Sequence, residues 1–231
     1  MFDRIAPRYD LLNRLLSAWI DTRWRRAAAD ALGLSGEASV LDLCTGTSDL
    51  LIETLRREPR LRGVGVDLSR QMLLRGAKKL ERRALSTRAA LASGDGERLP
   101  LGGALFDGAL VSFGIRNIAR ADLALRELHR VMKPGGRLVI LEFSMPRGVL
   151  GSLYRVYFGR VLPRIGGLVS GDASAYAYLP ASVERFYAPD ELGALMRTAG
   201  FETVSWRSLT FGIACLHVGD KPRAQAGKRA A

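Results

Sequence analysis

The feature that most limits the folds open to this chain is a regular alternation of short apolar runs with segments of helical periodicity. Five runs predict buried strands, at 39–46, 61–69, 89–96, 106–114 and 137–144. Between them, apolar residues recur at helical spacing over 49–58, 69–83 and 120–132, and a KPGG stretch follows as a stop signal. Strands that alternate with helices indicate a parallel sheet covered by helices on both faces.

The C-terminal part departs from this alternation. Two strand-like runs, FETVSWRSLT and GIACLHVGDK, meet at Phe211 and Gly212 and predict an antiparallel hairpin at the sheet edge. We therefore expect an α/β fold, with a doubly wound, mostly parallel, seven-stranded Rossmann-like sheet that ends in an antiparallel hairpin. A single domain over residues 1–221 fits this pattern.

Three segments lie outside the predicted sheet. Residues 1–34 read as an N-terminal helical cap, and residues 149–186 form an insertion too long for an ordinary connection. The insertion is rich in Leu, Tyr, Phe and Val, so we expect it to be ordered and to cover a substrate. Residues 222–231 are polar and aperiodic, which predicts a disordered tail.

Composition limits the cellular setting more than the function. The net charge of +12, from 35 basic and 23 acidic residues, fits nucleic acid, an anionic membrane surface or a bias toward arginine. Cys44 and Cys215 lie far apart and outside any CxxC pattern, as expected in a reducing cytoplasm. The charged N-terminus does not resemble a signal peptide, and no run reaches the roughly 18 apolar residues that span a bilayer. We expect a cytoplasmic protein and leave open a position at the inner face of the cytoplasmic membrane.

The loop after the first predicted strand resembles a nucleoside-cofactor loop. Ligands of open α/β sheets bind outside the carboxyl ends of the strands. The phosphate-binding fingerprint G-x-G-x-x-G is absent, but a looser acidic-x-G-x-G-x-G pattern is typical of enzymes that bind S-adenosylmethionine. Asp42 takes the acidic position, Cys44 and Ser48 replace two glycines, and Gly46 retains the middle one. A plain strand–helix turn is the alternative.

The next two strand ends add to this interpretation. Asp67 follows Gly46 by 21 residues, which suits a carboxylate that binds the hydroxyls of a ribose. Asp67 or Ser69 as the N-cap of the following helix is the alternative. Asp95 and Gly96 end the third predicted strand, where they would lie beside an adenine ring. A D-G turn is the alternative there.

Together these motifs resemble the class I S-adenosylmethionine-dependent methyltransferases. Within that class the chain is similar to the ubiquinone/menaquinone biosynthesis C-methyltransferases, on the stretches APRYDLLNRLLS, SFGIRN and YLPASVERF. The resemblance covers Met1 to about Lys221, and its departures are Cys44, Ser48 and Gly96. It implies S-adenosylmethionine as cofactor, with contacts from Gly46, Thr47, Asp67, Asp95, Gly96 and Ser112. Tyr9 is a further candidate, or else a packing residue.

The resemblance also implies a reaction and a partner. The expected reaction is C-methylation of demethylmenaquinol, with a polyprenyl methoxy-benzoquinol as the second candidate. The short N-terminal segment favours the naphthoquinol. The expected partner is thus a polyprenylated quinol, and a homodimer is left open. Methylation of another small molecule or of nucleic acid is a more distant alternative, because no base-methyltransferase motif follows the fourth strand.

Arg116 and Asn117 are the predicted catalytic residues, because they end the fourth predicted strand. A guanidinium stays protonated, so Arg116 would stabilise a developing phenolate and hold a water that accepts the proton. Asn117 would orient that hydroxyl or water. Alternatively, Asn117 caps the next helix and Arg116 is a solvated surface group. Acidic residues do not cluster as metal ligands, so we expect no metal, and His129 and His217 are expected to be structural.

The insertion is amphipathic and basic. Arg155, Arg160 and Arg164 interrupt an apolar series at helical spacing. Such a segment suits peripheral contact with an anionic membrane, or a cover over an apolar substrate tunnel. A helix packed on the protein's own core is the alternative.

Overall fold

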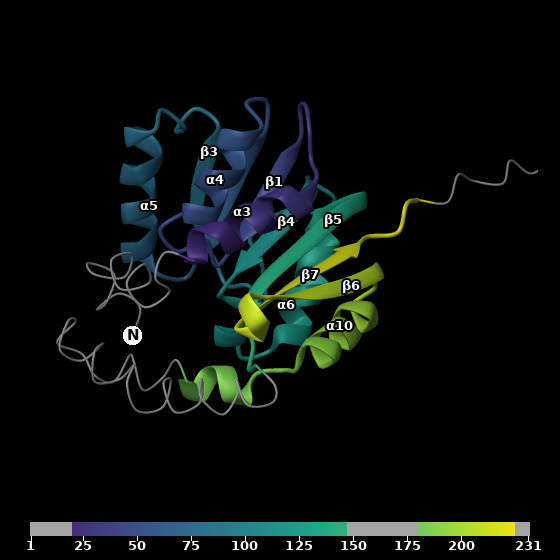
Figure 1. The fold of residues 1–231 in the computed structure, drawn as a ribbon. Coiled ribbons are helices and arrows are strands. Elements are labelled where there is room, and N and C mark those ends of the chain that lie inside the picture. The colour runs from purple at the N-terminus through teal and green to yellow at the C-terminus, as the bar shows by residue number, and fades with distance from the viewer. Residues whose placement is uncertain (1–19, 147–179, 225–231) are drawn as a thin grey trace, which may run out of the picture.

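A seven-stranded sheet forms the centre of the molecule (Figure 1), in the order β3-β2-β1-β4-β5-β7-β6. A computed structural model describes residues 20–146 and 180–224. The strands are β1 (Ser39–Leu43), β2 (Arg62–Asp67), β3 (Ala89–Ser93), β4 (Phe106–Ser112), β5 (Met132–Phe143), β6 (Glu202–Leu209) and β7 (Ala214–Asp220). Strands β1 to β5 pair in parallel, whereas β7 is antiparallel to both β5 and β6. The predicted fold class is confirmed. Strand β6 of the antiparallel hairpin forms one edge of the sheet, and β3 forms the other.

Helices cover both faces of this sheet (Figure 1). They are α3 (Ile20–Leu32), α4 (Asp49–Arg57), α5 (Arg70–Arg82), α6 (Ala121–Val131) and α10 (Pro189–Thr198), with short 3₁₀ turns η1 (Ile115–Asn117) and η3 (Thr210–Gly212). Neighbouring strand residues point to opposite faces. Leu110 and Val139 accordingly share a core with α3, α4 and the end of α5. Ala109 and Ile140 share the other core with α6 and α10.

The fifth strand begins earlier than the sequence predicts. It starts at Met132 rather than Arg137, and the KPGG stretch interrupts its pairing with β4. Phe106 pairs with Met132 and Gly108 with Arg137, so four residues of β5 bulge opposite one residue of β4. The stop signal is still correct for the helix, since α6 ends at Val131. From Arg137 onward the two strands run in regular register to their carboxyl ends.

Several sequence-based predictions fall wholly or partly outside the described residues. These are Tyr9 and most of the helical cap, most of the insertion at 149–186, and the end of the tail. Only α3 from the cap and a short helix at 180–185 from the insertion are described. Among the helices of residues 20–146 and 180–224, none is long and apolar enough to cross a membrane. The domain limits therefore remain predictions.

Candidate functional site

The loop between β1 and α4 has an unusual backbone. Cys44, Gly46 and Ser48 all adopt positive φ angles, of 56°, 55° and 65°. These are the three glycine positions of the predicted cofactor loop, and glycine is the residue that adopts this conformation without strain. A side chain at Gly46 would meet no atom within 4 Å, so the loop leaves open space at that point. The glycine pattern thus reflects a backbone requirement that Cys44 and Ser48 meet under strain.

Asp67 joins the carboxyl ends of the first three strands. Its Oδ2 accepts a hydrogen bond from the Gly46 amide at 2.8 Å, and its Oδ1 accepts one from the Ser69 amide at 2.8 Å. The Asp67 carbonyl accepts a hydrogen bond from the Gly94 amide, at the end of β3. Ser69, not Asp67, is the N-cap of α5, since its hydroxyl accepts from the Met72 amide. Ser69 rather than Asp67 therefore fills the capping role, which decides between the two residues that the sequence offered for it.

Thr47 is held by a lysine that the sequence analysis did not single out. Lys79 on α5 donates from Nζ to the Thr47 hydroxyl at 2.8 Å and to Asp49 Oδ1 at 2.6 Å. The chain offers no short sequence signal for this contact, because Lys79 lies 32 residues further on.

Two titratable groups lie at the start of this loop, the buried Asp42 and the half-buried Cys44. Asp42 is 1% exposed, and burial is the main reason that its pKa rises to about 7. A hydrogen bond from Thr45 at 2.6 Å opposes this shift, and the nearby charge of Asp67 adds to it. Burial, together with the same carboxylates, raises the pKa of the Cys44 thiol far above its usual range. Cys44 is therefore not a nucleophile at neutral pH.

The β3–β4 loop brings Asp95 and Gly96 to the same edge. Asp95 is exposed and accepts a hydrogen bond from the Glu97 amide, whereas Gly96 is buried. A Cβ atom on Gly96 would come within 2.9 Å of Ile118, so this loop packs closely against the segment after β4. Glu97 accepts a hydrogen bond from the Arg120 amide at 3.0 Å, at the N-terminus of α6. The loop therefore supplies a cap for α6, the role that was the alternative prediction for Asn117.

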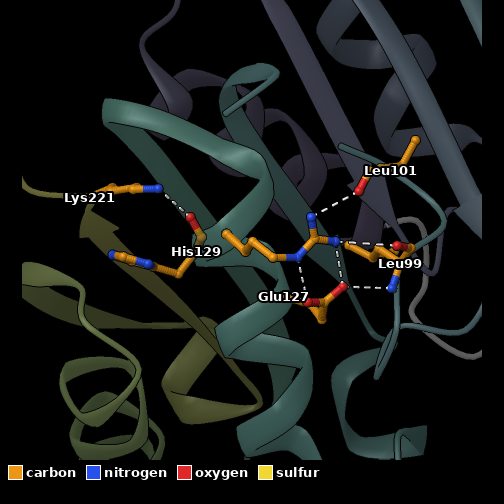
Figure 2. A network of polar contacts seen from close by, with 6 residues as sticks. Leu99, Leu101, Glu127, His129 and Lys221 are labelled. Carbon is orange, nitrogen blue, oxygen red and sulfur yellow. Dashed lines mark hydrogen bonds and ion pairs between the residues drawn. The ribbon is translucent and has the colours of Figure 1, made fainter. Parts of the chain in front are cut away.

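A second set of contacts fixes the same loop further along (Figure 2). Glu127 on α6 accepts a hydrogen bond from the Leu99 amide at 2.8 Å. Arg130 binds Glu127 and also donates to the carbonyls of Leu99 and Leu101. On the other side of α6, Lys221 donates to the His129 carbonyl at 2.7 Å. The imidazole of His129 packs edge-on against Phe201, which fits the structural role predicted for it.

Arg116 is buried rather than solvated. Its side chain is 7% exposed and pairs with Glu142 on β5, whose side chain is 2% exposed. Arg116 Nη1 donates to Glu142 Oε1 at 2.5 Å and to the Phe113 carbonyl at 2.6 Å. Burial raises the pKa of Glu142 above its usual value, against the opposing effect of Arg116. Asn117 lies in η1 and its Nδ2 donates to the same Phe113 carbonyl at 3.4 Å.

Three aromatic rings lie beside this ion pair. Phe143 lies 5.2 Å from the Arg116 guanidinium and 4.4 Å from the ring of Phe113. Trp24 on α3 contacts both phenylalanines, at 6.0 and 6.1 Å between ring centroids. The predicted site residues Ser112, Arg116 and Asn117 thus adjoin an apolar aromatic cluster at the carboxyl end of β4. In the part of the chain that the structure describes, no acidic, His and Cys residues gather as a metal site.

The whole chain matches known quinone methyltransferases. The model of the ubiE/COQ5 methyltransferase family matches residues 1–221. A demethylmenaquinone methyltransferase of Thermus thermophilus is 50% identical over 96% of this chain and 100% of its own length. A ubiquinone/menaquinone biosynthesis C-methyltransferase UbiE of Syntrophotalea carbinolica is 50% identical over 95% of this chain and 92% of its own.

Solved structures agree on the fold. A crystal structure of an S-adenosylmethionine-dependent methyltransferase from Thermotoga maritima superposes with a TM-score of 0.65. It covers 95% of this chain and 97% of its own, at 21% identity, which speaks for the fold alone. The family comes instead from the sequence matches, which confirm the resemblance inferred from the motifs. The chain belongs to the ubiE/COQ5 methyltransferase family.

Proposed function

We propose that this protein transfers a methyl group from S-adenosylmethionine to a ring carbon of demethylmenaquinol. The observation that carries the proposal is the pairing of a nucleoside-type loop with a buried, oriented arginine beside an aromatic cluster, at one edge of the sheet. Family membership sets the reaction class, and the name of the Thermus thermophilus relative indicates the naphthoquinol. The UbiE name of other relatives favours a polyprenyl methoxy-benzoquinol as the second candidate.

The loop residues fit the cofactor chemically. Gly46 presents backbone beside open space, as a close approach of the donor requires. Asp67 holds two amide donors at the end of β2, and a carboxylate is the acceptor that the vicinal hydroxyls of a ribose require. We assign the adenine to Asp95 and Gly96, and further contacts to Thr47 and Ser112. When bound, S-adenosylmethionine supplies an activated methyl group whose leaving group is a neutral thioether.

The chain's own residues must make the acceptor carbon nucleophilic. A phenolic hydroxyl has a pKa of about 10, so it needs help to lose its proton at neutral pH. Arg116 stays protonated and can stabilise the developing phenolate and orient a water that takes the proton. Asn117 helps to orient that water. The thiol of Cys44 is excluded as the base because burial keeps its pKa far too high.

The apolar surroundings suit a quinol with a prenyl tail. Trp24, Phe113 and Phe143 pack on one another beside Arg116, and this cluster would give the substrate site an apolar, aromatic wall. We propose a cytoplasmic enzyme that meets its substrate at the inner face of the cytoplasmic membrane. The net charge of +12 supports peripheral contact with anionic lipid, and nucleic acid is not a proposed partner. A homodimer is left open.

Turnover by the Arg116→Ala variant tests the catalytic assignment. Loss of one positioned donor to a developing oxyanion lowers kcat by roughly 10²–10³-fold. We expect that loss with purified demethylmenaquinol, while calorimetry shows unchanged binding of S-adenosylmethionine. Arg120→Ala is the matched control, because that side chain is 61% exposed at the start of α6. Near-normal turnover of Arg116→Ala would remove the proposed role.

The substrate is tested in a deletion strain by mass spectrometry of its quinones. We expect demethylmenaquinone to accumulate and to disappear when the gene is restored. Accumulation of a demethylated benzoquinone instead would transfer the assignment to the second candidate. A normal quinone profile would refute both.

A further inference from the structure

Glu142 is an acid near the carboxyl end of β5, directly after the apolar run 138–141. Three donors surround its carboxylate: Arg116 Nη1 at 2.5 Å and the Phe143 amide at 2.8 Å on Oε1, and the Arg116 amide at 3.4 Å on Oε2. No short sequence motif points to Glu142, which lies 26 residues from Arg116 along the chain. The pairing of Ser112 with Leu141 brings the two ends together. Glu142 therefore fixes both the backbone and the guanidinium of Arg116.

Stability alone does not account for this ion pair. Taking two charges out of water is costly, and apolar residues of similar volume often serve a core equally well or better. Burial raises the pKa of Glu142, against the opposing effect of Arg116, which shows that its carboxylate is held out of water. The fold therefore keeps a costly pair at the edge of the sheet where the substrate is proposed to bind. A requirement at that edge explains its position.

The guanidinium is only partly used by the protein. Its Nη1 is hydrogen-bonded twice, to Glu142 and to the Phe113 carbonyl. Its Nε is buried and, among the residues described, has no hydrogen-bond partner. A buried N–H group without a partner is rare and costs free energy. The ion pair thus holds the guanidinium through Nη1, while the Nε–H group remains available as a hydrogen-bond donor.

We propose that Glu142 is a positioning residue for methyl transfer: it fixes the Arg116 guanidinium through Nη1 and keeps the remaining donors in place for the oxygen of the aromatic substrate. This inference rests on the proposed function, in which Arg116 stabilises a developing phenolate. Glu142 itself touches neither substrate nor cofactor. Preorganised donors of this kind cost no reorientation during the reaction.

Glu142→Gln is the sharpest single change. All three neighbours of the carboxylate are donors, so either orientation of the amide places its NH₂ group against another N–H. We expect kcat to fall by about 10- to 100-fold, with the Kd for S-adenosylmethionine unchanged. Glu142→Asp keeps the charge and should recover part of kcat. Wild-type kcat in Glu142→Gln would overturn the positioning role.

A matched control lies on the same strand. Arg137 and Asp220 form a two-point ion pair near the start of β5, away from the carboxyl edge. Asp220→Asn removes a carboxylate from an arginine ion pair that is more exposed than that of Glu142 and lies away from the proposed site, and we expect its kcat to equal that of the wild type. An equal loss of kcat in Asp220→Asn and Glu142→Gln would show a general effect on the fold and would also overturn the inference.

Chemical rescue separates this inference from the proposed function. In Arg116→Ala, guanidinium ion at millimolar concentration should bind beside Glu142 and raise kcat at least tenfold. In the double variant Arg116→Ala/Glu142→Gln, which leaves no unpaired buried charge of this pair, the rescue should be lost. Equal rescue in both variants refutes the role of Glu142 alone. Full activity of Arg116→Ala without guanidinium refutes the proposed role of Arg116, and with it this inference.

Discussion

At the scale of single residues, the cofactor loop contains a strained serine. Ser48 has a φ of 65°, is fully buried, and its hydroxyl has no hydrogen-bond partner among the described residues. It is the N-cap of α4 by position, yet its side chain makes no capping bond. Positive φ costs a non-glycine residue about 1–2 kcal/mol, and a buried unpaired hydroxyl costs roughly as much. Serine is therefore a poor fit at a position where the loop backbone favours glycine.

We predict that Ser48→Gly stabilises the protein. Removal of the strain and of the unpaired hydroxyl outweighs the extra conformational entropy of glycine in the unfolded chain. The free energy of unfolding should rise by about 1 kcal/mol. Thermal unfolding should show this as a higher Tm. Ser48→Ala removes the hydroxyl but keeps the strain, so its Tm should lie between those of wild type and Ser48→Gly. A lower Tm for the glycine variant would contradict the strain argument.

At the scale of elements, α6 acts as the support of the β3–β4 loop (Figure 2). Glu97 of the loop binds the start of α6, and Glu127 of the helix binds the Leu99 amide in return. Hydrogen bonds to a charged group contribute about 1.5–3 kcal/mol. The loop that carries Asp95 and Gly96 is thus attached to the helix at two places.

We predict that Glu127→Ala loosens this loop without affecting the chemistry. Loss of the contact should raise amide hydrogen exchange over residues 97–103 by about tenfold or more, since each 1.4 kcal/mol is a factor of ten. S-adenosylmethionine should bind several-fold more weakly, while kcat at saturating cofactor stays unchanged. Glu53→Ala is the control, because Glu53 on α4 forms its ion pairs with Arg26 and Arg57, which are partly exposed. Unchanged exchange in Glu127→Ala would show that the contact adds nothing.

The sequence predicted elements better than the contacts between them. Apolar runs and helical spacing located the first five strands and the hairpin, because burial on a sheet imposes those patterns locally. Arg116 was found because it closely follows the fourth predicted strand. Its partner Glu142 was not, because their contact depends on the β4–β5 register rather than on any short motif. Lys79 and Glu97 were missed for the same reason, since each acts on a residue more than 20 positions away.

At the scale of the whole molecule, the central strand contains a carboxyl group that links stability to pH. Asp42 lies on β1, between β2 and β4, and burial is the main cause that raises its pKa from 3.8 to about 7. Between these two pH values the native state binds a proton that the unfolded state has lost. The contribution of Asp42 to the free energy of unfolding therefore falls as pH rises through this range.

We predict that Asp42→Asn removes this dependence in the cofactor-free protein. Each pKa unit corresponds to about 1.4 kcal/mol, so the full effect approaches about 4 kcal/mol. Relative to wild type, the variant should gain stability between pH 5 and pH 8, as measured by urea unfolding at both pH values. The other groups with shifted pKa values do not cancel this difference, because they are present in both proteins. Glu142 acts alike in the two proteins. Burial lowers the pKa of His217, which destabilises both proteins below its unfolded pKa. A constant difference between the two proteins across this range would mean that Asp42 is ionised within the sheet.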